Sequence, residues 1–199
     1  LDDDDDVMIG DETAFFAAPA TVDAFADLYA RNIDAVIVAG ATDVGLWITK
    51  QLRILPKIIH LGRVESLADI QRREKFYQIG AGATFAQVET ALTAIDSDLG
   101  VVLRRIGSKQ VRAAGTLGGN VANGSPVGDT LPVLIALGAT LHLRQGKDVR
   151  TLPLEDFFIE YGKQDCRPGE FITAVDVPAL SVDEVFRCYK LSKRFDQDI

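Results

Sequence analysis

A glycine-rich stretch near the middle of the chain is the strongest constraint on how this sequence folds. The stretch "GTLGGNVANGSPVGD", from Gly115 to Asp129, contains five glycines, two asparagines and a proline. Glycine loses more conformational entropy on folding than any other residue, so folded proteins place it where the backbone turns with positive φ or closely approaches a ligand. A plain surface connector is the alternative interpretation, and the rest of the sequence has to separate the two.

The 199-residue chain as a whole has the composition of a folded protein. Its residues are 47% hydrophobic and 25% charged, which is enough for one domain or two small lobes with a real core. Asp2 to Asp6 supply five of the negative charges behind the formal net charge of −8 and leave −3 for the remainder. A run of aspartates is typical of a solvated tail, so we expect an acidic linker over residues 1–14.

Several classes of protein are excluded by composition. The 21 lysines and arginines are scattered rather than striped, which argues against nucleic-acid binding. We find no apolar run of membrane-spanning length, and the acidic start is unlike a signal peptide. Two cysteines, Cys166 and Cys188, are too few for a disulfide framework, and with His60 and His142 they form no metal-ligand cluster. We therefore expect a cytoplasmic protein with no nucleic-acid, membrane or metal site in this chain.

The pattern of apolar residues predicts two lobes. Over residues 15–73 a capped amphipathic helix (21–32) and two short β-branched strands (35–40 and 57–62) indicate a small βαβ lobe. Residues 74–199 predict a larger mixed lobe with an antiparallel sheet. Its expected elements are a helix with a Thr84–Gln87 capping box, a buried helix over 130–138, a hairpin over 139–154 and strands over 170–178 and 184–195.

A second glycine loop, "AGATDVG" (Ala39 to Gly45), follows the strand predicted over residues 35–40. A strand that runs into such a turn can point several backbone N–H groups at a phosphate, although a simple strand-to-helix turn is the alternative. Leu46 and Trp47 stand where a Walker A loop needs Lys and Ser or Thr, so the chain is not a P-loop nucleoside triphosphatase. Phe85 occupies the third glycine position of a fingerprint that would begin at Gly80, so the Rossmann motif also fails.

Two glycine loops, one in each lobe, suit one long ligand with a diphosphate in its middle. Each N–H bond to a charged phosphate oxygen contributes about 1.5 to 3 kcal/mol, so a few of them can hold a dinucleotide. The carboxylate of Asp129 suits a ribose hydroxyl, because it accepts hydrogen bonds and repels phosphate.

Three segments, "AGATDVGLWITK", "RAAGTLGGNVANGSPVGD" and "YKLSKRFDQDI", resemble the FAD-binding domain of the xanthine dehydrogenase and carbon monoxide dehydrogenase family of molybdenum hydroxylases. The resemblance covers residues 15–199 and is closest to the small-subunit type of bacterial xanthine dehydrogenase. It implies a two-lobed α+β fold of the vanillyl-alcohol-oxidase-like type, with FAD extended between the small βαβ lobe and the larger mixed lobe.

The resemblance also implies the residues that contact FAD. Asp129 is implied to bind the adenosine ribose, Ile172 to lie beside the adenine, and Lys190 to lie close to the flavin, where its charge favours the reduced anionic form. The other implied contacts come from the strand and first loop and from the glycine-rich stretch: Val38, Gly40, Ala41, Thr42, Asp43, Val44, Gly45, Ile106, Thr116, Gly119, Asn120, Asn123 and Ser125.

Two positions depart from the family pattern. Ala41 replaces a Gly or Asn that is common there, and its Cβ is tolerated if φ is negative. Ile106 stands where some relatives place an aromatic ring against the adenine. The family continues beyond residue 199 into a further subdomain and carries an iron–sulfur domain before the acidic linker, so we expect an interior piece of a longer chain.

The function implied by the resemblance is electron relay. Hypoxanthine or xanthine is oxidised at a molybdenum cofactor, electrons pass through iron–sulfur clusters, and FAD passes a hydride to NAD. The expected partners are an upstream iron–sulfur domain and a molybdenum-binding large subunit in a higher-order oligomer. The alternatives are an FAD subunit for another donor (carbon monoxide, an aldehyde or an aromatic compound), a self-contained flavin oxidoreductase, and a nucleotide-binding module without redox turnover.

Overall fold

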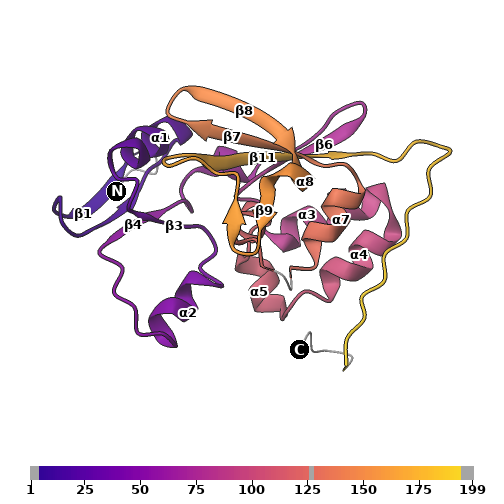
Figure 1. Ribbon diagram of the computed structural model, residues 1–199, viewed down its shortest axis with the longest axis horizontal. Coiled ribbons are helices and arrows are strands. Elements are labelled where there is room, and N and C mark those ends of the chain that lie inside the picture. Colours follow the sequence, from indigo (N-terminus) through magenta and orange to yellow (C-terminus); the bar gives the residue numbers. More distant parts are fainter. Residues whose placement is uncertain (1–4, 126–127, 194–199) are drawn as a thin grey trace.

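The fold combines two larger sheets and a two-stranded hairpin with a layer of helices. The computed structural model describes residues 5–125 and 128–193. A four-stranded sheet has the order β1-β2-β4-β3, and a five-stranded sheet has the order β5-β6-β11-β7-β8. Figure 1 shows the first sheet with α1 and α2 at one end of the molecule and the second sheet with the remaining helices at the other. The predicted mixed α+β class is therefore confirmed.

The first sheet contains the predicted βαβ unit. Strands β2 (Phe15–Ala18) and β3 (Val36–Val38) both run parallel to β4 (Lys57–His60). Helix α1 (Val22–Arg31) begins after Thr21, whose side chain accepts a hydrogen bond from the backbone N–H of Ala24, and it buries Phe25 against the sheet. Helix α2 (Val44–Thr49) follows the first glycine loop and has no buried residue.

Residues just after the aspartate run differ from the expected linker. Strand β1 (Val7–Gly10) pairs antiparallel with β2, so the expectation of a solvated linker is wrong for these four residues. The charge run ends at Asp6, whose carboxylate accepts a hydrogen bond from the N–H of Ala20 at 2.8 Å. The apolar sequence that follows adds a ladder to an edge that would otherwise be open, which satisfies backbone groups on both strands.

The second sheet is antiparallel throughout. Its strands are β5 (Ile70–Arg72), β6 (Phe76–Gly80), β7 (Thr140–Gln145), β8 (Asp148–Pro153) and β11 (Phe171–Pro178). The predicted hairpin over 139–154 is confirmed as β7–β8. Strand β5 lies before the predicted lobe boundary after residue 73, and yet it pairs with β6 of this sheet. The exact position of the lobe boundary stays a prediction.

Helices cover one face of the second sheet and form the main core with it. Side chains that alternate along β7 and β11, such as Leu141 and Val175, are fully buried against this layer. Helix α3 (Phe85–Ile95) carries the predicted capping box. The other helices are η1 (Glu65–Ala68, a 3-10 turn), α4 (Ser97–Arg104), α5 (Lys109–Ala114), α6 (Leu117–Asn123), α7 (Thr130–Ala136) and α8 (Leu154–Phe157).

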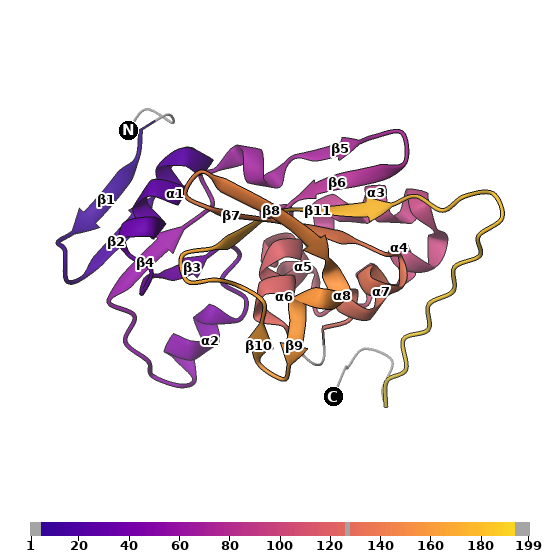
Figure 2. The ribbon, with the colours of Figure 1, turned by 45° about the horizontal axis from the view of Figure 1, so that its top comes forward.

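Half of the glycine-rich stretch is helical rather than a loop. Helix α6 begins after Thr116 and ends at Gly124, whose φ of +56° is the left-handed conformation that terminates many helices. The hairpin of β9 (Phe158–Glu160) and β10 (Lys163–Gln164) lies beside α6, on the side that faces α2 (Figure 2).

The strand predicted over residues 184–195 does not form in the part of it that the structure describes, through residue 193. This extended segment crosses the helical layer instead. Phe186 is buried in the main core, and the N–H of Cys188 donates to the Asp98 carboxylate at 3.2 Å. The Asp98 side chain of α4 thus binds a backbone N–H that a sheet neighbour would otherwise pair.

An aromatic cluster and an ion pair are among the contacts that join the two parts. Phe171 of β11 inserts into the core of the first part, where its ring centroid lies 4.3 Å from that of Phe25. Arg144 of β7 pairs with Asp23 of α1 at 2.5 Å. Within residues 5–125 and 128–193, no helix has both the length and the apolar character needed to cross a bilayer.

Candidate cofactor-binding site

A cavity of about 400 Å³ lies where the two parts of the molecule meet. It is bounded by the first glycine loop, α6, the end of β10 and the start of β11. Of the residues that the sequence implicated, the cavity brings together Gly40, Ala41, Thr42, Asp43, Val44, Thr116, Gly119, Asn120, Asn123 and Ile172.

The two glycine segments touch through their backbones. A Cβ built on Gly40 would lie 1.8 Å from the carbonyl oxygen of Ala114, which directly precedes the glycine-rich stretch. Real Cβ atoms do not approach other atoms this closely, so only glycine permits the contact. The first glycine of the motif thus allows two distant segments to form one wall.

The next residue shows a strained backbone. Ala41 has a φ of +56°, so the negative φ that would accommodate its Cβ without strain is not present. The left-handed conformation costs a residue with a Cβ about 1–2 kcal/mol. Strain of this kind persists only where the surrounding structure holds it, and it often accompanies binding sites.

Hydrogen bonds fix the polar side chains of the α6 wall. The hydroxyl of Thr116 accepts from the N–H of Gly119 at 3.1 Å. The hydroxyl of Thr130, at the start of α7, donates to the side-chain oxygen of Asn120, which leaves the amide NH2 of Asn120 as a donor. Gly118 packs against Ala81, where a Cβ would lie 2.4 Å from the Ala81 Cβ.

Six predicted residues lie outside this cavity. Val38 is buried in β3, Gly45 lies in α2, Ile106 packs against the main core, and the carbonyl of Ser125 accepts from the N–H of Gly128. Asp129 and Lys190 lie together at a second, smaller cavity of about 250 Å³ between α4, α7 and the C-terminal segment.

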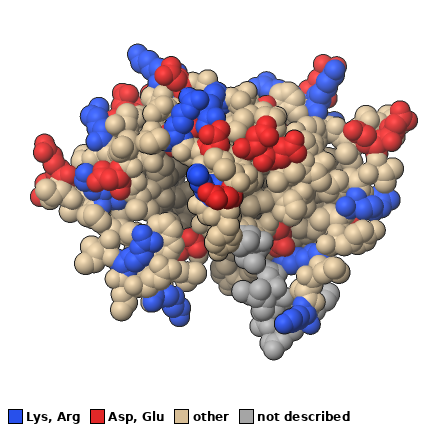
Figure 3. Space-filling view, viewed as in Figure 1, with Lys and Arg blue, Asp and Glu red and all other residues tan. Residues whose placement is uncertain are grey.

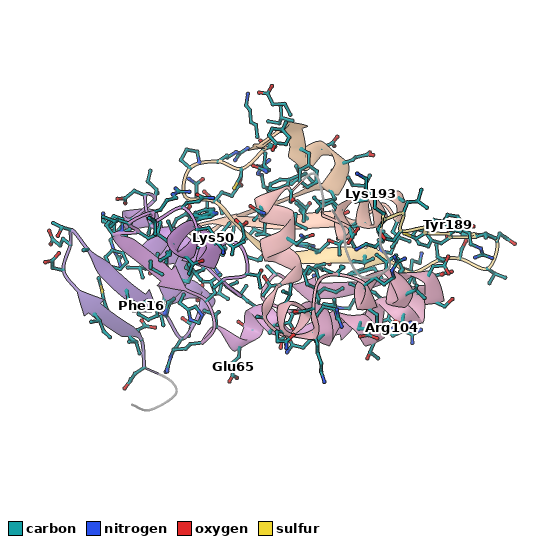
Figure 4. The ribbon with its side chains drawn as sticks, turned by 90° about the horizontal axis from the view of Figure 1, so that it is seen from below. Phe16, Lys50, Glu65, Arg104, Tyr189 and Lys193 are labelled. Carbon is teal, nitrogen blue, oxygen red and sulfur yellow. The ribbon has the colours of Figure 1, made fainter. Side chains whose placement is uncertain are left out.

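Lys190 and Asp129 form an ion pair there. The lysine Nζ lies 2.6 Å from an Asp129 carboxylate oxygen and 2.9 Å from the carbonyl oxygen of Arg105, and its side chain is only 7% exposed. In Figure 4, Tyr189, the neighbour of Lys190, is well separated from Lys50 at the end of α2. The pair therefore anchors the C-terminal segment to the helical layer.

Other residues that line the cavity were not implicated by the sequence. They come from α1, α2, α3, α8, β10, the segment before β11 and β11 itself, and include Tyr29, Trp47, Phe85, Phe157, Gln164, Cys166, Glu170 and Phe171. Partial desolvation raises the pKa of the Tyr29 hydroxyl and of the Cys166 thiol, although Cys166 is an exposed residue. No local sequence motif marks these residues, although Phe171 could have been suspected as the neighbour of Ile172.

Charge in the cavity is sparse. Among its described lining residues are two carboxylates, Asp43 and Glu170, and no lysine or arginine. The guanidinium of Arg150 holds the pKa of Glu170 below its ordinary value. On the face seen in Figure 3, acidic and basic side chains are interspersed rather than gathered by sign. An anion in this cavity would therefore be held mainly by N–H and hydroxyl donors.

Comparison with known proteins decides the family. The family described as "FAD binding domain in molybdopterin dehydrogenase" matches residues 11–180 of this chain. The chain belongs to this family. The predicted resemblance to the FAD-binding domains of xanthine dehydrogenase and carbon monoxide dehydrogenase is thereby confirmed.

Curated relatives of this FAD-binding domain are much longer oxidoreductases. The chain is 30% identical over 210 residues to a nicotinate hydroxylase of Emericella nidulans and 28% identical over 200 residues to a xanthine dehydrogenase/oxidase of Gallus gallus. These alignments cover 96% and 94% of the chain. The chain spans about 15% of the length of each relative.

Solved structures confirm the fold of the domain. A Cu,Mo carbon monoxide dehydrogenase superposes with a TM-score of 0.83 at 23% identity, over 91% of this chain and 64% of the other. Quinoline 2-oxidoreductase from Pseudomonas putida 86 superposes with a TM-score of 0.79 at 24% identity, over 87% and 61%.

Proposed function

We propose that the cavity holds FAD with its diphosphate between the Gly40–Val44 loop and α6. The observation that carries this proposal is the backbone contact at Gly40, because it places both glycine segments around one cavity. The lining fits the group: N–H, hydroxyl and amide donors face a space to which no described residue contributes a cationic side chain. Apolar side chains such as Ile172 offer a surface for the adenine.

FAD supplies two-electron storage and hydride transfer. The residues of this chain would bind and orient it: backbone N–H groups and the amides of Asn120 and Asn123 would bind phosphate oxygens, and aromatic walls would exclude water. Asp129 as ribose acceptor and Lys190 as the flavin-tuning residue stay predictions, since both lie in the second cavity. The separate cores of the two sheets support the two-lobed, vanillyl-alcohol-oxidase-like arrangement.

The reaction we propose for the complete enzyme is oxidation of xanthine or hypoxanthine at molybdenum, with iron–sulfur clusters as carriers and NAD as acceptor. The proposed partners are an iron–sulfur domain, a molybdenum-binding subunit and further copies in a cytoplasmic oligomer. Xanthine enzymes among the relatives support this donor. A nicotinate hydroxylase among them supports the alternative of an aromatic donor.

Titration of the full chain with FAD tests the proposal. We expect saturable quenching of flavin fluorescence at one FAD per chain, and no xanthine-dependent reduction of NAD by this chain alone. Failure to bind FAD would contradict the cofactor assignment. Steady NADH formation from xanthine after chelation of metals would contradict the relay and favour a self-contained oxidoreductase.

The role of Lys190 is tested by Lys190→Ala in the FAD-loaded chain. If its charge acts on the flavin, the midpoint potential falls, because a cation stabilises the reduced anionic form. Lys193→Ala is the control, since Lys193 is exposed on the same segment. An unchanged potential together with a lowered unfolding temperature in both Lys190→Ala and Asp129→Asn would assign the pair to anchoring alone.

A further inference from the structure

Arg150 of β8 makes four hydrogen bonds to the segment that precedes β11. Its Nε and Nη2 donate to the two carboxylate oxygens of Glu170 at 2.7 and 2.8 Å. Its Nη1 donates to the Asp165 carboxylate at 2.8 Å, and Nη2 also donates to the Asp165 carbonyl at 2.6 Å. The guanidinium thus binds both ends of the segment formed by residues 165–170.

This segment is a tight turn. The N–H of Glu170 donates to the carbonyl of Arg167 at 2.9 Å across Pro168 and Gly169, and Gly169 has a φ of +80°. Proline followed by a residue with positive φ is the pattern of a type II turn. The carboxylate of Glu170 also accepts from the N–H of Arg167 at 2.9 Å, so the turn closes on the same carboxylate that Arg150 holds.

This turn forms part of the cavity wall. Cys166 and Glu170 line the cavity, as do Gln164 before the turn and Phe171 and Ile172 after it. Arg150 does not line it. The side chain of Glu170 is 3% exposed, whereas that of Asp165 is 44% exposed. Of the two ion pairs of Arg150, the buried one with Glu170 is therefore the one at the cavity wall.

A buried ion pair is not needed for stability as such, because well-packed apolar residues often serve as well. A guanidinium that binds a carboxylate through two parallel bonds does define orientation. We infer that Arg150 is a positioning residue for the cofactor: through Glu170 and Asp165 it holds the wall from Gln164 to Ile172 in the conformation that receives FAD. This inference rests on the proposed binding of FAD in the cavity.

The test compares Arg150→Lys with Arg144→Lys in the full chain. Lysine keeps the charge at residue 150 but cannot form the paired bonds. We expect the dissociation constant for FAD to rise about tenfold in Arg150→Lys, the equivalent of one charge-assisted hydrogen bond. Arg144 pairs with Asp23 outside the cavity, so Arg144→Lys should bind FAD as the unmodified chain does. If Arg150→Lys does not fold, Asp165→Asn replaces it as the test variant. Asp165 is half-exposed, so this change should raise the dissociation constant for FAD by a smaller factor.

A second readout reports on the wall without FAD. In a Cys188→Ser background Cys166 is the single thiol, and its Sγ lies 3.4 Å from the Glu170 carbonyl oxygen. We expect iodoacetamide to modify Cys166 several-fold faster in Arg150→Lys than in Arg144→Lys. An unchanged alkylation rate would overturn the inference that the hydrogen bonds of Arg150 hold residues 165–170 in place. Faster alkylation with unchanged FAD affinity would overturn the positioning role. Absence of FAD binding in the unmodified chain would instead overturn the proposed function, while the alkylation rates would still test whether Arg150 holds residues 165–170 in place.

Discussion

Gly40→Ala is expected to abolish detectable FAD binding, with a loss of affinity of about 100-fold or more, the equivalent of roughly 2.7 kcal/mol. The added Cβ would lie 1.8 Å from the carbonyl oxygen of Ala114 and 2.5 Å from its carbon. Both are backbone atoms, so no side chain can move aside. The loop after β3 must then separate from the glycine-rich stretch, which opens the cavity at the position proposed for the diphosphate.

Gly45→Ala is the matched control for this change. Gly45 lies five residues further along in α2, and a Cβ there meets nothing within 4 Å. Alanine should favour this helix by up to about 1 kcal/mol relative to glycine. Fluorescence titration with FAD, together with circular dichroism of both variants, separates loss of the site from loss of the fold. Binding of FAD by Gly40→Ala at the strength of the unmodified chain would contradict the shared site.

Arg150→Met is expected to destabilise the chain by about 3 kcal/mol, the low end for removal of one partner from a buried ion pair. The carboxylate of Glu170 stays buried after the change and keeps the hydrogen bond from the N–H of Arg167 within the turn. Urea unfolding at pH 7 measures the difference. Arg144→Met is the control: its partner Asp23 is 83% exposed, so a cost of about 1 kcal/mol or less is expected.

The cost of Arg150→Met should depend on pH in a defined direction. Arg150 lowers the pKa of Glu170 from its ordinary value of 4.5, so the pair contributes stability above that value. The contribution is lost as the pH falls through the lowered pKa, because the folded protein must then protonate the paired carboxylate. The difference in unfolding free energy between the two proteins should therefore be smaller at pH 4 than at pH 7. A difference that grows in acid would contradict the assignment to Glu170.

Local features of the fold were predictable from the sequence. The capping box at Thr84 and the cap at Thr21 form as expected, since both depend on residues a single turn apart. The β7–β8 hairpin also forms over the predicted residues, because alternating apolar side chains flank a short glycine turn. The glycine content of two segments predicts a common ligand, and residues from both segments line one cavity.

Tertiary structure alone decided the rest of the site. The Tyr29 and Cys166 wall comes from segments far apart in the chain, which meet because Phe171 packs into the core of the first sheet. The pairing of Lys190 with Asp129 likewise joins residues 61 positions apart. Burial and hydrogen-bond partners at such distances are set by how the two sheets pack, and local pattern carries no information on that packing. The sequence thus determined which backbone could approach a diphosphate, whereas the packing of the two sheets determined what surrounds it.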